Sequence, residues 1–130
     1  MAENLTKIMY VEDEEYLRQI VEMALERVGG FNITTCASGT DALALLDEVR
    51  PDLILLDVRL PGMTGPELLT EIRKQDDFKA TPVIYVTASV MDDELDEYRN
   101  SDAIAVISKP FDPMTLSVRI REVWERHDGT

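Results

Sequence analysis

Carboxylates, a hydroxyl and an ammonium group stand at the ends of strand-like apolar runs in this chain. Glu12 and Asp13 follow the first run, and Asp57 follows the third. Thr87 ends the fourth run, and Lys109 comes just after the fifth. Because the carboxyl ends of parallel strands meet at one edge of a sheet, where open α/β sheets bind their ligands, we expect these side chains to converge.

Such a group of side chains suits phosphoryl transfer. Crowded carboxylates repel one another, and a hard divalent cation such as Mg²⁺ relieves that repulsion while keeping several waters and bridging to phosphate. Lys109 would supply a point charge for phosphate oxygens, and Thr87 a hydrogen-bond donor. One carboxylate is then free to act as a nucleophile and form an aspartyl phosphate, in a reaction that depends mainly on positioning and charge neutralisation.

Each of these residues also has an ordinary structural explanation. Asp57 alone could cap its strand or the next helix, Thr87 could be a plain strand-end hydroxyl, and Lys109 a solvated surface charge. Glu14 and Glu15 are best explained as acids that favour the positive N-terminus of a helix. The joint occurrence of the site residues at four strand ends, in the right order, favours the chemical interpretation.

The elements that position these residues alternate between strand and helix. Short apolar runs typical of strands alternate five times with segments whose apolar residues are spaced along one helix face. The central run is unbroken, as in a strand that is buried on both faces. Strands are expected at 7–11, 31–36, 53–56, 83–87 and 103–108, and helices around 17–28, 42–49, 66–72, 90–100 and 112–124. This pattern predicts an α/β fold, a doubly wound five-stranded parallel sheet with five helices on its two faces.

Residues with positional preferences mark several helix ends. Ser38 is expected to cap the second helix, and Pro66 to lie in the first turn of the third. Asp112 is expected to cap the last helix, and Gly29 and Gly30 to end the first. These signals bound the loops that follow the strands, and the candidate site is built on those loops.

The composition narrows the class of protein. The 130 residues fit one domain, 1–130, and no apolar run approaches the roughly 20 residues of a membrane span. The start is not a secretory signal, and Cys36, the only cysteine, is expected to be a buried inert thiol, so we expect a cytoplasmic protein. A net charge of −13 argues against direct binding of nucleic acid or an anionic membrane and is compatible with a basic protein partner.

Taken together, the motifs resemble those of response-regulator receiver domains of two-component signalling, of the single-domain chemotaxis type. They are YVEDEE at the first strand end, LLDVRLPGMTG at the third, VTAS at the fourth and SKPF at the fifth. The resemblance covers nearly the whole chain. It implies the flavodoxin-like receiver fold with strand order 2-1-3-4-5.

The resemblance also implies roles for the site residues. Asp57 would accept a phosphoryl group from a histidine kinase or histidine phosphotransfer protein, and Thr87 and Lys109 would contact its oxygens. Mg²⁺, or Mn²⁺ as an alternative, would be held by Glu12, Asp13, Asp57 and the backbone carbonyl of Arg59. The bond before Pro110 would be cis. Phosphorylation would draw Thr87 inward and remodel the face of the fourth helix, fifth strand and last helix, which an unknown downstream protein would bind.

Three features bear on regulation. Val106 stands where receivers usually carry Tyr or Phe, so we expect the output face to switch by a backbone shift or through the fourth helix. Arg59 lies near the expected path of hydrolytic water, where its side chain could change the lifetime of the phosphate. Five acids within 92–97 would repel a second copy of the chain, which favours a monomer or a weak dimer.

Other functions compete with a signalling switch that is not an enzyme. A phosphatase of the haloacid dehalogenase type also uses a strand-end aspartate with Mg²⁺. That class carries a cap domain and a second aspartate two residues after the first, and at that position this chain has Arg59. A constitutive interaction module is another alternative, which the unusual Val106 keeps open. The chain could also be a receiver from a longer regulator, although no output domain is expected within it.

Overall fold

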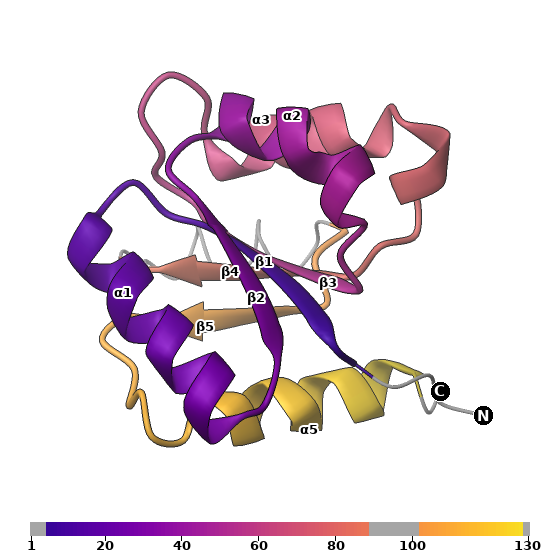
Figure 1. The fold of residues 1–130 in the computed structure, drawn as a ribbon. Helices are drawn as coiled ribbons and strands as arrows, with labels where there is room; N and C mark the ends of the chain where they lie inside the picture. The colour runs from indigo at the N-terminus through magenta and orange to yellow at the C-terminus, as the bar shows by residue number, and fades with distance from the viewer. Residues whose placement is uncertain (1–4, 89–101, 129–130) are drawn as a thin grey trace.

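The computed structural model describes residues 5–88 and 102–128, which form a parallel sheet flanked by helices (Figure 1). The strands are β1 (Lys7–Val11), β2 (Asn32–Cys36), β3 (Leu53–Asp57), β4 (Val83–Thr87) and β5 (Ala105–Ser108). They pair in the order β2-β1-β3-β4-β5, and every pair is parallel. The predicted fold class and strand order are therefore confirmed, with strand boundaries within two residues of the expected ones.

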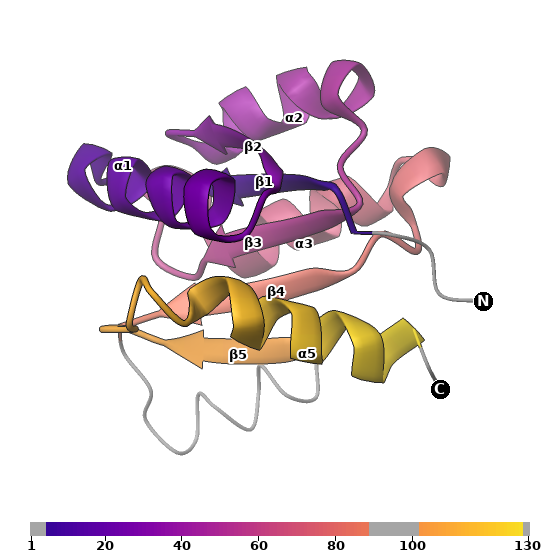
Figure 2. The same cartoon turned by 60° about the horizontal axis from the view of Figure 1, so that its bottom comes forward.

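Helices cover both faces of the sheet. They are α1 (Glu15–Met23) with the π-helical turn η1 (Ala24–Val28), α2 (Gly39–Val49), α3 (Gly65–Arg73), the 3₁₀ turn η2 (Asp76–Phe78) and α5 (Leu116–Asp128). Figures 1 and 2 show α2 and α3 on one side of the sheet and α1 and α5 on the other. The predicted helix at 90–100, with its acidic run, lies outside the described residues. Every helix within the described ranges is too short or too polar to span a membrane.

Two apolar layers sandwich the sheet, because successive strand residues point to opposite faces. On β1, Met9 and Val11 join the cluster under α2 and α3, whereas Ile8 and Tyr10 join the cluster under α1 and α5. All five residues of β3 are buried, as the unbroken apolar run predicted for a central strand. The carboxyl end of β3, which carries Asp57, is thus fixed by packing on both sides.

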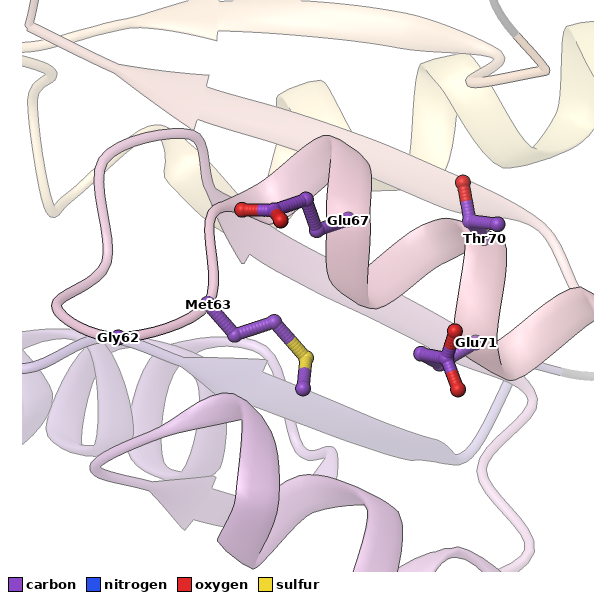
Figure 3. Close-up of a pocket in the computed structure, with 5 residues that line it drawn as sticks. All are labelled: Gly62, Met63, Glu67, Thr70 and Glu71. Atoms are coloured by element: carbon purple, nitrogen blue, oxygen red, sulfur yellow. The ribbon is translucent and has the colours of Figure 1, made fainter.

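A capping box fixes the start of α3, which follows the loop after Asp57. The Thr64 hydroxyl accepts a hydrogen bond from the Glu67 N–H at 3.3 Å, and the Glu67 carboxylate accepts one from the Thr64 N–H at 3.1 Å. Pro66 lies in the first turn, as predicted. Beside α3 is a groove of about 350 Å³, lined by Gly62, Met63, Glu67, Thr70 and Glu71 (Figure 3). Its two acids bond to Thr64 and Lys74, and its lining includes none of the carboxylates at the strand ends.

The helix ends confirm the predicted cap at Ser38 and the predicted stop at Gly29 and Gly30, and they correct the predicted cap at Asp112. The Ser38 hydroxyl accepts from the Asp41 N–H at 3.1 Å and caps α2, as predicted. Asp112 instead precedes α5 by four residues and accepts from the Met114 N–H at 2.9 Å, so it closes a preceding turn rather than capping the helix. Val28, which continues the apolar spacing of the first helix, is nevertheless 47% exposed, because the wider π turn of η1 departs from the 3.6-residue period.

Candidate functional site

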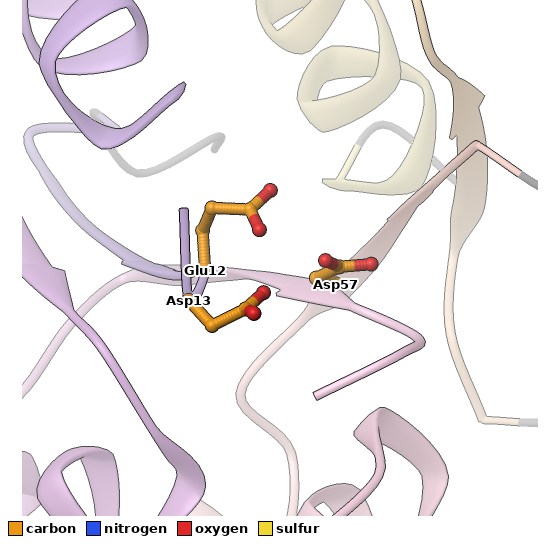
Figure 4. A group of neighbouring side chains, drawn as sticks. All are labelled: Glu12, Asp13 and Asp57. Atoms are coloured by element: carbon orange, nitrogen blue, oxygen red, sulfur yellow. The ribbon is translucent and has the colours of Figure 1, made fainter. Parts of the chain in front are cut away.

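Three carboxylates meet where β1 and β3 end. Among the described residues, Glu12, Asp13 and Asp57 each offer one oxygen, and these oxygens lie within 4.8 Å of one another. The register explains their meeting: Val11 pairs with Leu56, so Glu12 after β1 and Asp57 at the end of β3 lie at the same edge. Figure 4 shows the Glu12 and Asp13 side chains turning toward Asp57. The structure thus brings together the three acids singled out in the sequence.

Lys109 bridges the two buried members of this group. Glu12 is fully buried and Asp57 is 6% exposed, whereas Asp13 lies at the surface. The Lys109 ammonium lies 2.5 Å from Glu12 Oε1 and 3.2 Å from Asp57 Oδ2. A buried carboxylate without such a partner is strongly disfavoured, so the bridge makes this arrangement stable.

The bridge also keeps Lys109 charged. Burial by itself lowers the pKa of Lys109, but its hydrogen bonds and charge interactions with Glu12 and Asp57 outweigh burial and raise the pKa above the ordinary value. The ammonium is therefore present at neutral pH as a donor for incoming anionic oxygens.

Backbone groups around Asp57 hold its carboxylate and set its surroundings. The Arg59 N–H donates to Asp57 Oδ1 at 3.2 Å, while Lys109 holds Oδ2. Gly65 approaches so closely that a Cβ there would lie 2.6 Å from the Asp57 carbonyl oxygen. The role of the Arg59 carbonyl as a metal ligand stays a prediction, whereas its amide already contributes to positioning Asp57.

Thr87 lies at the same edge of the sheet, at the end of the strand next to Asp57. Val86 pairs with Asp57, and the Thr87 carbonyl accepts a hydrogen bond from the Lys109 N–H at 2.8 Å. Thr87 is fully buried. By the two-residue alternation its side chain leaves the strand on the face of Tyr85, which packs toward α2 and α3. Its contact with a phosphoryl group stays a prediction.

The donor set fits a divalent cation. The group offers oxygen ligands from carboxylates, which Mg²⁺ prefers, and solvent can reach it on the side of the exposed Asp13. By formal charge, three carboxylates and one ammonium sum to −2, which one divalent ion balances. The residues present therefore suit Mg²⁺ or Mn²⁺.

Two contacts to Glu12 were missed in the sequence. The Tyr10 hydroxyl donates to Glu12 Oε1 at 2.9 Å, and Arg18 Nη1 donates to the Glu12 carbonyl oxygen at 2.8 Å. Burial first, and then the charge and hydrogen bond of Glu12, raise the pKa of Tyr10 well above its ordinary value, so the phenol keeps its proton. The two-residue spacing of Tyr10 and Glu12 on one strand face was the signal available for the first contact.

An apolar hollow opens beside Lys109. It has a volume of about 200 Å³ and lies between α1 and the segment that joins β5 to α5, lined by Tyr16, Leu17, Ile20, Lys109, Pro110, Phe111 and Pro113. The Lys109–Pro110 peptide bond is cis, as the resemblance implied. Tyr16 is 66% exposed, so an aromatic side chain is available to a partner at the border of the site.

Comparisons with known proteins agree with the fold and the motifs. The family model described as response regulator receiver domain matches residues 8–121. Chemotaxis protein CheY of Pseudomonas aeruginosa is 32% identical over 123 residues, which cover 95% of this chain and 99% of that protein. Transcriptional regulatory protein AfsQ1 of Streptomyces coelicolor is 38% identical over 122 residues, and the match spans 94% of this chain but only 52% of AfsQ1.

Solved structures give the same result. The chemotaxis response regulator CheY4 of Vibrio cholerae superposes with a TM-score of 0.83 at 32% identity, over 92% of this chain and 99% of CheY4. The sheet order, the acids at the strand ends and the family match all coincide in one chain. This chain belongs to the response regulator receiver domain family of two-component signalling.

Proposed function

We propose that this chain is a phosphorylation-controlled signalling switch, in which Asp57 accepts a phosphoryl group from the phosphohistidine of a histidine kinase or a histidine phosphotransfer protein. The observation that carries this proposal is the Lys109 ammonium, which bridges Glu12 and Asp57 beside Asp13. A nearly buried nucleophile, a fixed cation and an adjacent acidic cluster are the parts that phosphoryl transfer to a carboxylate requires.

In the proposed reaction, an Asp57 oxygen attacks phosphorus and the new O–P bond forms as the N–P bond to histidine breaks, with the electron pair returning to the imidazole. Lys109 moves its donated hydrogen bonds from Glu12 and Asp57 to the phosphoryl oxygens, and the Thr87 hydroxyl donates to another oxygen. Mg²⁺, held by Glu12, Asp13, Asp57 and the Arg59 carbonyl, would neutralise negative charge on the transferred group. The chain assists its own phosphorylation and dephosphorylation without being an enzyme for another substrate.

Two surfaces support the proposed partners. The apolar hollow beside Lys109 would receive the phosphodonor, because Lys109, which bonds to Asp57, lines it and Tyr16 is exposed at it. A second hollow of about 280 Å³ lies between β5 and α5, lined by Ile104, Ala105, Val123, Arg126 and His127. We assign this β5–α5 side to the downstream protein. The net charge of −13 on the chain favours a partner that is basic overall. With these partners, we propose that the chain works in the cytoplasm.

The direct test is phosphorylation by a small-molecule donor. Purified protein is incubated with acetyl phosphate and MgCl₂, and its intact mass is read over time. Wild type should gain one phosphate, and Asp57→Asn should gain none. Asp76→Asn is the matched control, because Asp76 is an exposed acid of η2 that pairs with Lys79 and is not part of the cluster. Equal labelling of wild type and Asp57→Asn would contradict the proposal.

A further inference from the structure

Tyr10 is a buried polar residue that the proposed reaction does not use. Its ring is fully buried in the apolar cluster under α1 and α5. Its hydroxyl reaches Glu12 Oε1 because residues two apart on a strand point to the same face, and the ring spans the distance between neighbouring side chains. A buried tyrosine hydroxyl needs a partner, and here that partner is a candidate metal ligand.

The two carboxylate oxygens of Glu12 have different hydrogen-bond partners. Oε1 accepts from both the Tyr10 hydroxyl, at 2.9 Å, and the Lys109 ammonium, at 2.5 Å. Oε2 accepts one longer hydrogen bond, at 3.3 Å, from the Glu14 N–H. A carboxylate oxygen accepts about two hydrogen bonds, so Oε1 is filled and Oε2 keeps capacity for another ligand.

We propose that Tyr10 is a positioning residue for the metal site, which holds Glu12 so that Oε1 faces Lys109 and Oε2 stays available to a divalent cation. This inference rests on the proposed function and adds a residue to it. A glutamate has one more rotatable bond than an aspartate, and the Tyr10 hydroxyl restricts that freedom at the buried end of the side chain. Metal ligands held by such outer partners bind more tightly than unsupported ones.

The same hydroxyl prepares Glu12 for the release of Lys109. When Lys109 turns to the phosphoryl oxygens, Glu12 Oε1 loses its ionic partner while it remains buried. The Tyr10 hydrogen bond then keeps that oxygen satisfied, which lowers the free-energy cost of the transfer. Removing the hydroxyl should therefore weaken metal binding and slow phosphorylation together.

The test is Tyr10→Phe, which keeps the ring and removes the hydroxyl. Mg²⁺ binding is measured by titration calorimetry without phosphodonor, and Mn²⁺ binding by electron paramagnetic resonance. We expect affinity to fall about tenfold, the lower end of the effect of losing a partner that supports a metal ligand. Phosphorylation by acetyl phosphate should need a correspondingly higher Mg²⁺ concentration for its half-maximal rate.

A double-mutant cycle separates positioning from stability. In Glu12→Asp the carboxylate is one methylene shorter and withdraws from the phenol, so adding Tyr10→Phe to Glu12→Asp should change metal affinity little further. Tyr85→Phe is the matched control, because Tyr85 is also a buried strand tyrosine but belongs to the cluster on the opposite face. It should leave Mg²⁺ affinity unchanged even where it lowers the unfolding temperature.

The outcomes distinguish this inference from the proposed function. Unchanged Mg²⁺ and Mn²⁺ affinity in a folded Tyr10→Phe variant would overturn the inference and reduce Tyr10 to a core residue. An equal loss in Tyr10→Phe with and without Glu12→Asp would also overturn it, because the effect would not pass through Glu12. Failure of wild type to gain phosphate would instead overturn the proposed function, while the metal titrations still decide the role of Tyr10.

Discussion

Lys109 has two roles in this molecule that an exposed lysine would not have. It compensates the charge of the fully buried Glu12, and it donates a hydrogen bond to Asp57 that phosphoryl oxygens would accept in the proposed reaction. Breaking a buried pair by removing one partner leaves an uncompensated charge, which is far more damaging than losing an exposed pair. The lysine therefore links stability to chemistry at the scale of one side chain.

We predict that Lys109→Met lowers the free energy of unfolding by roughly 3 kcal/mol, because Glu12 and Asp57 then remain buried without a cation. Mg²⁺ should restore part of the loss, and urea unfolding with and without MgCl₂ measures both effects. Lys79→Met is the control, since Lys79 pairs with Asp76 at the surface and should change stability by less than about 0.5 kcal/mol. Equal effects of the two substitutions would contradict this account of the bridge.

Cys36 gives a second prediction for a single residue. Burial first, and then the charge of Asp41, raise the pKa of the Cys36 thiol from 9.0 to about 11. Because the folded pKa is the higher one, the thiol's contribution to stability is complete below pH 9 and is lost as the pH rises through about 11. Over this range wild type should lose roughly 2–3 kcal/mol more unfolding free energy than Cys36→Ala, measured by urea titration at each pH.

Thiol labelling provides the independent check. Cys36 is 3% exposed, so a disulfide reagent at pH 8 should label it only after unfolding. Rapid labelling of the native protein would show that the thiol is not protected.

The inert burial of Cys36 was predictable from its apolar, strand-like neighbours. The Tyr10–Glu12 hydrogen bond was not predicted, because it depends on the rotamers of two long side chains.

At the scale of elements, the loop from β3 to α3 ties Asp57 to the start of a helix. The Gly65 N–H donates to the Val58 carbonyl at 2.9 Å, and the Thr64–Glu67 capping box fixes the first turn of α3. The hydrogen bonds from Thr64 lower the pKa of Glu67, which keeps this acid charged at the positive helix end. Substitutions at the start of α3 should therefore shift the backbone of Asp57, the proposed acceptor.

We predict that Gly65→Ala reduces phosphorylation of Asp57 as well as stability. A Cβ at this position would lie 2.6 Å from the Asp57 carbonyl oxygen and 2.9 Å from Val58 Cα, so the backbone that carries the acceptor must shift. Gly62→Ala is the control, because Gly62 has φ +81° and open space around it. It should cost about 1–2 kcal/mol of backbone strain while the rate with acetyl phosphate stays near that of wild type. Equal rates for both variants would refute the coupling.

Some features of the helices and strands could be predicted from the sequence, and others could not. The unbroken run at 53–56, the Ser38 cap and the position of Pro66 follow from local preferences, and the structure has them as predicted. The π turn at η1 was not predicted, although Gly29 ends the helix as expected. A Cβ at Gly29 would lie 2.8 Å from side-chain atoms of Phe31 and Ser117, so the packing there requires glycine. Asp112 likewise lies in a turn four residues before α5, and no single residue type in the sequence predicts that turn.

At the scale of the whole molecule, charge is the dominant feature. A net charge of −13 on 130 residues makes the folded chain repel itself, and salt should relieve this repulsion without any specific site. The carboxylate cluster adds a local concentration of negative charge at one edge of the sheet. A divalent cation should then stabilise the chain in two ways, by general screening and by binding at the cluster.

These two effects are separable at matched ionic strength. We predict that MgCl₂ raises the free energy of unfolding more than NaCl does, by roughly 1.4 kcal/mol when Mg²⁺ is at about ten times its dissociation constant. Asp13→Asn removes an exposed member of the cluster and leaves the Lys109 bridge in place, so it should respond to both salts alike. Urea unfolding of both proteins in the two salts measures the difference. A Mg²⁺ advantage that persisted in Asp13→Asn would place the stabilising ion elsewhere than at the strand ends.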